Sequence, residues 1–435
     1  MRDIAVLIFL IACIGGALYR PWIGVLALAV FSYLNPHAYA WGAVRSLPAF
    51  QILFLVVAAS TLFTKDRQAL PKDWRIPVFF LLWFYFFITT TQAYLPQFAW
   101  PKLLFVSKVF IPLIFTIILI NTREKLFYLI ITIGASIGIV AVKGGIFAIM
   151  SGFSYRVYGP PATQFNENNA FAIAVLIAIP LLLLWSRETT SKNIRLGIYS
   201  AIPIMFASAL SSWSRGAFLT MGVLALLLIW HSKRKYLVIP LFIFGAYLAV
   251  DNLPEEWFGR MDTIQTYEED KSASGRLEVW RDGWNHTLEH PILGAGFEGW
   301  LIVSMRDWHS APVEIFSEHG FIAFGMWASL IIGTLLSLSS LPRQVKGIAG
   351  MEWVGNYCYM LRLSLVAYCV GTLFLGLSYW DILYHLIFIA VLVKQFALKE
   401  LDEKISSGQT PGAKGGRMTM LRNGRQPRPL GTKPL

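Results

Sequence analysis

Charged residues are scarce in this chain, and their scarcity excludes the commonest class of protein. Only 14% of the 435 residues are Asp, Glu, Lys or Arg, while 56% are hydrophobic. A typical soluble domain carries about 25% charged residues. A chain of this length with so few charges cannot cover a water-exposed surface with them. The composition therefore excludes a soluble enzyme and indicates a protein that resides in lipid.

Cysteine is also scarce, and its positions exclude a disulfide framework or a zinc ribbon. The three cysteines, Cys13, Cys358 and Cys369, lie inside apolar runs and lack the paired spacing of metal ligands. We interpret them as apolar filling of the protein interior. The first apolar run, 4–19, lacks a small-residue cleavage site and leads straight into a second run. We therefore expect a retained membrane helix and not a signal peptide.

Apolar runs of helical length recur along the whole chain. They lie at 4–19, 22–34, 50–64, 76–91, 103–120, 126–150, 169–185, 196–213, 216–230, 236–250, 320–341, 360–376 and 382–396. A membrane-spanning helix needs about 20 residues, so the shorter runs must be tilted or broken. The pattern predicts an all-α polytopic integral membrane protein with about 12 transmembrane helices. It leaves open on which side of the membrane the first 35 residues begin.

The charge of the chain is unevenly distributed. Segment 251–310 holds twelve acidic and five basic residues, a net charge of −7, so the rest of the chain carries +19. The basic residues cluster in short loops beside apolar runs, which the positive-inside rule explains without a nucleic-acid partner. These loops, and the basic tail 399–435, are expected in the cytoplasm. We expect a transmembrane bundle at 1–250, an extracytoplasmic loop at 251–319, C-terminal transmembrane helices at 320–398 and a disordered tail.

Arg215 is the first candidate for function. Fifteen apolar residues, 216–230, separate it from the basic cluster at 231–235. That run covers about 22 Å as a helix, which is less than the roughly 30 Å hydrocarbon core. Arg215 is therefore expected below the outer membrane surface, where an ionisable residue is a functional candidate. The alternative is an arginine that extends to the outer headgroups.

Arg276 is the second candidate. Leu277, Trp280, Trp284 and Leu288 follow helical spacing, and Pro291 marks the expected end of the helix. If Ser274 or Gly275 caps this helix, Arg276 lies in its first turn. Helix amides and a guanidinium would together attract an anion. A pair between Arg276 and a nearby acidic residue explains the spacing equally well.

His309 is the third candidate. Ser310 can cap a helix and Pro312 suits its first turn, so His309 is expected just before a helix start. Because 320–341 is long enough to span, 310–319 should extend that helix above the membrane. A neutral imidazole beside a helix N-terminus can act as a general base. An exposed capping histidine is the alternative.

Several short motifs, taken in order, resemble the O-antigen ligase and polymerase superfamily of bacterial inner membranes. They are Tyr158-Gly159-Pro160-Pro161 with Asn168-Asn169-Ala170, Ser214-Arg215-Gly216, Ser274-Gly275-Arg276 with Trp280, the PILGAGF sequence at 291–297, and His309-Ser310 followed by Glu318-His319-Gly320. Asn35-Pro36-His37, the YGPP sequence and the YEED sequence at 267–270 are similar to the exosortase-associated O-glycosylation ligase branch.

The resemblance implies a GT-C-like glycosyltransferase that needs neither metal nor cofactor. Its donor would be a glycan linked to undecaprenyl pyrophosphate, whose pyrophosphate Arg215 and Arg276 would bind, with His309 as the general base. The further site candidates are Arg156, Asn168, Trp280, Arg281, Glu318 and His319. The acceptor would be the lipid A core oligosaccharide for a ligase, a second repeat unit for a polymerase or a Ser/Thr hydroxyl for a protein ligase. The other partners would be membrane lipids, and the active site would be periplasmic.

A protein without enzymatic activity is the alternative to a glycosyltransferase. A flippase or transporter of lipid-linked sugars could also hold buried arginines in its helices. The chain shows no internal inverted repeat, and its long extracytoplasmic segment is more typical of catalysis outside the cytoplasm. Transfer of a glycan to an acceptor distinguishes the two classes.

Overall fold

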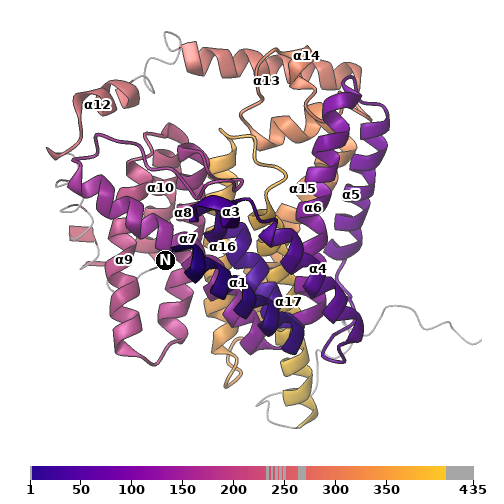
Figure 1. Cartoon of the computed structure of the whole chain (residues 1–435), viewed down its shortest axis with the longest axis vertical. Helices are drawn as coiled ribbons and strands as arrows, with labels where there is room; N and C mark the ends of the chain where they lie inside the picture. Colours follow the sequence, from indigo (N-terminus) through magenta and orange to yellow (C-terminus); the bar gives the residue numbers. More distant parts are fainter. Residues whose placement is uncertain are drawn as a thin grey trace, which may run out of the picture.

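The protein is a bundle of long helices with shorter helices across one end (Figure 1). The structure, a computed structural model, describes residues 2–231, 235–236, 239–240, 243, 247, 251–262 and 271–407. Among these residues there is no β-strand. The helices of the bundle are α1 (Arg2–Tyr19), α2 (Pro21–Tyr33), α4 (Ala49–Phe63), α5 (Arg75–Thr91), α6 (Pro96–Leu119), α7 (Arg123–Met150), α8 (Asn168–Glu188), α9 (Lys192–Leu210), α10 (Arg215–Trp230), α15 (Ala311–Gln344), α16 (Glu352–Thr372) and α17 (Asp381–Ser406). The other described helices are η1 (Pro36–Tyr39), α3 (Gly42–Arg45), α12 (Glu255–Asp262), α13 (Lys271–Glu289) and α14 (Trp300–Val303).

The helices follow the apolar runs of the sequence. Seven of the described helices are long and apolar enough to cross a membrane, and four shorter apolar helices pack beside them. Large apolar side chains such as Phe63 and Leu336 are exposed, which is the expected surface of a protein solvated by lipid. The all-helical, polytopic membrane architecture is confirmed. The number of about 12 spans stays a prediction, and most of run 236–250 lies outside the described residues.

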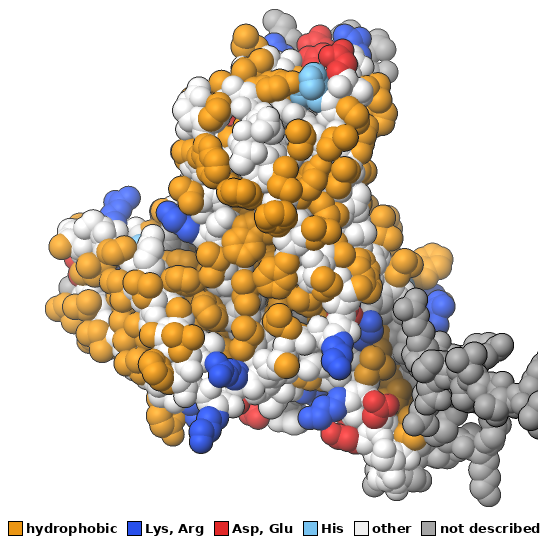
Figure 2. Space-filling model, turned by 90° about the vertical axis from the view of Figure 1, so that its right-hand side faces the viewer, with side chains coloured by type: hydrophobic (Ala, Val, Ile, Leu, Met, Phe, Trp, Pro, Cys, Tyr) orange, Lys and Arg blue, Asp and Glu red, His pale blue; other side chains and the backbone are white. Residues whose placement is uncertain are grey.

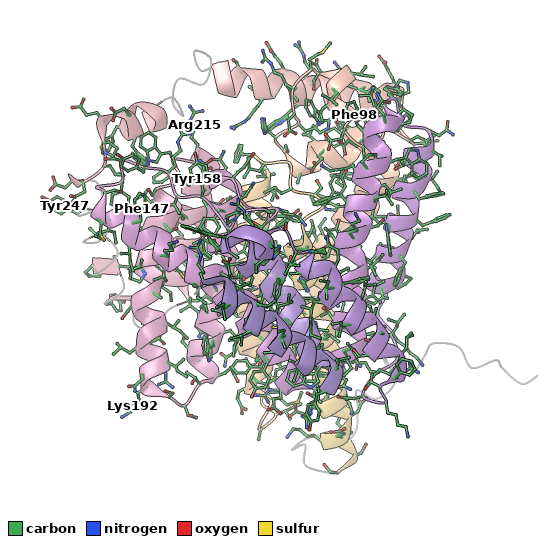
Figure 3. The ribbon with its side chains drawn as sticks, viewed as in Figure 1. Phe98, Phe147, Tyr158, Lys192, Arg215 and Tyr247 are labelled. Carbon is green, nitrogen blue, oxygen red and sulfur yellow. The ribbon has the colours of Figure 1, made fainter. Side chains whose placement is uncertain are left out.

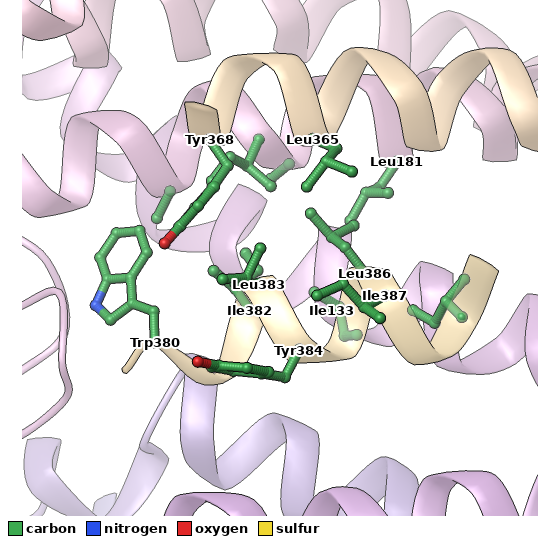
Figure 4. Close-up of a cluster of buried hydrophobic side chains, with 14 of the residues drawn as sticks. Ile133, Leu181, Leu365, Tyr368, Trp380, Ile382, Leu383, Tyr384, Leu386 and Ile387 are labelled. Carbon is green, nitrogen blue, oxygen red and sulfur yellow. The ribbon is translucent and has the colours of Figure 1, made fainter. Parts of the chain in front are cut away.

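Helices α8 and α17 form the centre of the bundle. Helix α8 packs against α7, α9 and α16, and α17 packs against α6, α15 and α16. Most residues in the apolar stretch of each helix are buried, which is typical of a helix that other helices surround. Figure 4 shows Leu181 of α8 and Leu386 of α17 in one cluster of buried side chains. Helix α17 continues to Ser406, so the tail expected from residue 399 begins later.

Ion pairs tie the basic loops together at one end of the bundle, here called the basic end. Lys125 Nζ lies 2.7 Å from Asp66 Oδ2, Arg123 contacts Glu188 at 3.4 Å, and Lys394 contacts Asp73 at 2.9 Å. Figure 2 shows several lysine and arginine side chains below a broad apolar surface, with acidic side chains among them and a further group of charged side chains at the top. Helices α12 and α13 lie at the opposite end, the α13 end (Figure 1).

The first helix begins toward the α13 end. Asp3 Oδ1 accepts a hydrogen bond of 2.8 Å from the backbone nitrogen of Trp41, which follows α2 and η1. Helix α2 starts near the basic end, where the Lys125 ammonium lies 5.8 Å from the Trp22 ring. At its other end, Asn35 Nδ2 donates to the Pro161 carbonyl at 2.8 Å. The contacts therefore place the start of α1 on the side opposite the basic loops.

Helix α15 is broken at Gly320, which corrects the continuous helix expected through 310–341. Gly320 has φ 75° and ψ 178°, and a Cβ there would lie 2.2 Å from the Ile292 carbonyl oxygen. The loop after α13 supplies the hydrogen bonds that the break removes. The Ala295 and Gly296 amides donate to the Ser317 and Glu318 carbonyls at 2.9 and 2.8 Å. A tertiary contact, which hydropathy does not encode, therefore ends the first part of α15.

Gly320→Ala is expected to destabilise the protein by at least about 1–3 kcal/mol, because this backbone conformation is nearly exclusive to glycine. Thermal unfolding in detergent measures the loss. Gly325→Ala is the control on the same helix, since a Cβ there meets nothing within 4 Å. Equal melting temperatures for the two variants would contradict the break at Gly320.

Helix α13 also differs from the expectation at its start. It begins at Lys271, so Arg276 lies in its second turn and not in the first. The buried face consists of Gly275, Val279, Gly283 and Thr287, whereas Leu277, Trp284 and Leu288 are about half exposed. At Gly283 a Cβ would lie 2.4 Å from Ser317 Oγ, so only a small residue permits this approach to α15. The helix ends at Glu289, before Pro291 as predicted.

The orientation predicts opposite labelling of two engineered cysteines. Asp307→Cys, at the α13 end, should react with a membrane-impermeant thiol reagent in intact cells, and Ser407→Cys should react only after lysis. The sequence also predicts that Glu268→Cys reacts from outside, but Glu268 lies outside the described residues. Labelling of Ser407→Cys in intact cells would contradict the orientation that the basic loops indicate.

Candidate active site

His309 lies on the surface of the α13 end beside an acidic partner. Its side chain is 48% exposed, and its Nδ1 lies 3.7 Å from Asp307 Oδ2. Asp307 Oδ1 also accepts a hydrogen bond of 3.4 Å from the His309 amide. Ser310 occupies the N-cap position of α15 as expected, but its side chain makes no capping hydrogen bond. The Nδ1 atom thus faces a carboxylate, which leaves Nε2 as the nitrogen available to a ligand.

Trp280 and Phe374 connect His309 to the start of α10. The Trp280 indole donates a 3.0 Å hydrogen bond to the carbonyl of Trp308, the residue before His309. Its ring lies 6.4 Å from that of Phe374, in the loop between α16 and α17. A Cβ on Gly216, the second residue of α10, would lie 3.3 Å from Phe374 Cβ. This contact series gathers Arg215, the turn of α13 that follows Arg276, and His309 at one end of the molecule.

The turn before Arg215 is held by residues from the first half of the chain. Asn168 Nδ2 donates to the Ser212 carbonyl at 2.7 Å, and the Arg156 guanidinium lies 5.4 Å from the Trp213 ring centre. Ser214 caps α10 by accepting a hydrogen bond from the Ala217 amide at 3.3 Å. Arg215 is therefore the first residue of α10, and Figure 3 shows it at the opposite end of the bundle from Lys192.

Strained backbone concentrates around these residues. In the described part of the chain, Trp213, Glu298, Met305 and His309 have φ between 46° and 59°, although none of them is glycine. Such conformations are uncommon for bulky residues and persist only where the surroundings impose them. Histidine is among the side chains that tolerate this region best. The strain marks the 298–309 segment and the 213–215 turn as a candidate functional site.

Glu318 and His319 lie below the surface and have protein partners. Glu318 is 2% exposed and accepts hydrogen bonds from the Glu298 amide (3.0 Å), the Trp308 indole (3.3 Å) and the Tyr379 hydroxyl (2.7 Å). His319 is fully buried, with Nδ1 2.6 Å from Thr89 Oγ1 and Nε2 2.9 Å from the Tyr379 oxygen. Burial, together with the Glu318 carboxylate, raises the pKa of Tyr379 well above its usual range, so its hydroxyl stays protonated. Glu318 and His319 therefore lie beneath the candidate site, where they hold its segments by hydrogen bonds.

The sequence analysis missed three residues beneath His309: Glu314, Ser378 and Lys102. Glu314 is 7% exposed and accepts hydrogen bonds from the Ser378 amide at 3.0 Å and hydroxyl at 2.6 Å. Lys102, on α6, lies 2.7 Å from Glu298 Oε1. Glu314 adjoins the His309 motif, and Lys102 directly precedes the apolar run 103–120, so both carried a signal in the sequence. The ion pair between Lys102 and Glu298, which lie 196 residues apart, did not.

His286, on α13, and His290, just after its end, could supply two of the ligands of a metal site. The His286 and His290 rings stack at 4.6 Å, and Tyr94 lies against both. Burial and the neighbouring His290 lower the pKa of His286, which favours a neutral ring. Within the described residues no third ligand joins them. Arg281 is exposed on the same helix and touches none of the residues around His309 in the contacts described above.

Two protein-family models match the chain. Residues 200–328 match the family model described as O-antigen ligase. The chain therefore carries a domain of the O-antigen ligase superfamily at these residues. Residues 1–190 match a family of unknown function (DUF5935). No curated protein matches the chain.

The O-antigen ligase domain contains Arg215, Arg276 and His309, together with Trp280 and Glu318. The other segments that build the site lie outside that domain. Lys102, Arg156 and Asn168 belong to the N-terminal family, and Phe374 and Ser378 follow the O-antigen ligase domain. The candidate site thus combines residues of the O-antigen ligase domain with residues from both flanking regions of the chain.

Proposed function

We propose that the protein is an O-antigen ligase that transfers a polysaccharide from undecaprenyl pyrophosphate to a hydroxyl of the lipid A core oligosaccharide. The observation that carries the proposal is the contact series from Gly216 through Phe374 and Trp280 to the residue before His309. It gathers a general-base candidate and two arginines at the end of the bundle opposite the basic loops. Superfamily membership supports glycosyl transfer as the reaction.

His309 is the general base of the proposed reaction. Its Nε2 takes the proton of the acceptor hydroxyl while the hydroxyl oxygen attacks the anomeric carbon of the donor sugar. The bond between that carbon and the phosphate oxygen breaks, and its electron pair leaves with undecaprenyl pyrophosphate. Asp307, 3.7 Å from Nδ1, orients the ring and stabilises the imidazolium that forms.

Arg215 and Arg276 bind the pyrophosphate in this proposal. A guanidinium presents parallel donors that match two phosphate oxygens, and it stays charged at any physiological pH. Two such groups offset the charge that develops on the leaving group, so the transfer needs no metal ion. Arg215 also stands at the N-terminus of α10, where the helix amides favour an anion. Arg276 lies in the second turn of α13, so its guanidinium would bind the anion without the amides of the helix N-terminus.

The proposed location is the bacterial inner membrane, with a GT-C-like arrangement and the site in the periplasm. The basic loops at the end opposite His309 support this orientation by the positive-inside rule. Segment 251–319 forms the catalytic loop between the bundle at 1–250 and the helices that follow. The C-terminal tail is cytoplasmic, since α17 ends beside the basic loops.

The experiment that tests the function offers one labelled donor to three acceptors. Protein in lipid nanodiscs receives an undecaprenyl pyrophosphate glycan with lipid A core, with a second donor molecule, or with a Ser/Thr peptide. A covalent conjugate to lipid A core is expected. A conjugate with either other acceptor would make the protein a polymerase or a protein O-glycosylation ligase. Movement of the donor across a vesicle membrane without formation of any conjugate would indicate that the protein is a flippase and not an enzyme.

A further inference from the structure

Lys102 is a cation set among acidic side chains beneath the proposed active site. Its ammonium lies 2.7 Å from Glu298 Oε1 and 6.0 Å from the centre of the Tyr379 ring. The Tyr379 hydroxyl in turn donates to Glu318 Oε2 at 2.7 Å, and Glu318 accepts from the Glu298 amide at 3.0 Å. Glu314 and Glu318 stand one turn apart on α15 and are 7% and 2% exposed. One lysine from the N-terminal family region therefore pairs with Glu298, which a hydrogen bond links to the buried glutamates of α15.

Each of the three carboxylates holds a different segment of the site. Glu318 accepts from the indole of Trp308, which immediately precedes His309. Glu314 binds Ser378 through Oε2, while its Oε1 faces the loop at Gly376. Glu298 accepts from the Trp300 indole at 2.9 Å, and its own amide donates to Glu318.

The buried Glu314 carboxylate and the surface pair Asp307–His309 meet at Gly376. A Cβ there would lie 3.3 Å from Glu314 Oε1 and 3.5 Å from Asp307 Oδ1. Glu314 and the Asp307 partner of His309 thus flank the same glycine. The placement of the Asp307–His309 pair depends on where the buried acids hold the 374–378 loop and Trp308.

Carboxylates gathered away from water repel one another unless a cation offsets their charge. Lys102 is the described cation that forms an ion pair within this group. We propose that Lys102 is a positioning residue, which holds Glu298, Glu314 and Glu318 together and thereby fixes Asp307 and His309 for the transfer. The inference rests on the proposed function for the role of His309. It gives the N-terminal region a part in the reaction of the O-antigen ligase domain.

Lys102→Met should lower kcat by about 10–100-fold, because displacement of a catalytic group by about 1 Å can cost that much. The KM for the lipid-linked donor should change less than about twofold, since Arg215 and Arg276 are untouched. Adding Glu298→Gln removes the carboxylate that has lost its cation. The double variant should therefore have a kcat at least about fivefold higher than that of Lys102→Met. Glu298→Gln alone serves as its reference. Lys108→Met is the matched control, an exposed lysine on the same helix, and should behave as wild type.

A second readout does not depend on transfer activity. Amide hydrogen exchange of peptides covering 304–311 and 374–380 should be faster in Lys102→Met than in wild type, and unchanged in Lys108→Met. Hydrogen exchange tests the inference even if the wild-type protein forms no conjugate. The absence of a conjugate would reject the proposed function but not the positioning role of Lys102. Unaltered exchange in Lys102→Met would overturn the inference, and so would a raised donor KM with normal kcat.

Poor folding of Lys102→Met is also informative. In that case the double variant with Glu298→Gln should recover the folded yield, because its charge is balanced again. Failure of the double variant to recover yield, exchange protection or kcat would reject the charge-holding role of Lys102.

Discussion

His309→Asn should lower the rate of glycan transfer by about 10²–10⁴-fold while the donor still binds. Loss of a general base typically has this effect. Asparagine is the most informative replacement because it tolerates the left-handed backbone of His309, φ 46°, and cannot accept the proton. His309→Ala should be equally inactive, with added backbone strain. The measurement compares conjugate formed and lipid-linked donor retained by the variants at equal amounts of folded protein.

His319 provides the control for this experiment. It is fully buried between Phe86 and Phe297 and contacts Thr89 and Tyr379. His319→Ala removes one buried hydrogen bond from each of these partners, and a hydrogen bond typically contributes about 0.5–1.5 kcal/mol of stability. We expect a lower melting temperature and partial activity for each folded molecule. An inactive, folded His319→Ala beside an active His309→Asn would show that the base is misassigned.

Arg215→Ala and Arg276→Ala should each weaken use of the donor by about 10–150-fold. A hydrogen bond to a charged group contributes about 1.5–3 kcal/mol, and each variant removes such contacts to pyrophosphate. Lysine should restore little, because an ammonium cannot present two parallel donors. The measurement is kcat/KM for the lipid-linked donor in membranes.

Arg343→Ala is the matched control for both arginines. Arg343 lies in the last turn of α15, away from the α13 end, so its removal should leave kcat/KM unchanged. Addition of EDTA should also leave the wild-type rate unchanged. Normal transfer by both Arg215→Ala and Arg276→Ala would reject the pyrophosphate assignment.

The helices were predictable because their signal is local. An apolar stretch of the right length reports a membrane helix whatever its neighbours are, and the bundle follows those stretches. The helix starts at Arg215 and beside His309 were also readable, since Ser214 and Pro312 carry their own signals. Two of the proposed site residues were thus placed correctly relative to their helices.

The errors arose where contacts between distant segments decide the structure. The close approach of Gly283 of α13 to α15 was not predicted, because hydropathy draws attention to Leu277 and Trp284 instead. The break at Gly320 depends on amides of the 291–296 loop, which no pattern within α15 reports. The pairing of Lys102 with Glu298 likewise joins segments 196 residues apart.

The stoichiometry of a single-turnover reaction tests the central claim most directly. Purified protein in EDTA receives donor labelled in both glycan and lipid, together with the acceptor that the nanodisc assay identifies. Our account predicts one undecaprenyl pyrophosphate released for each glycan conjugate formed, and neither product from His309→Asn. Conjugate formation without release of the lipid pyrophosphate, or equal turnover by His309→Asn, would contradict it.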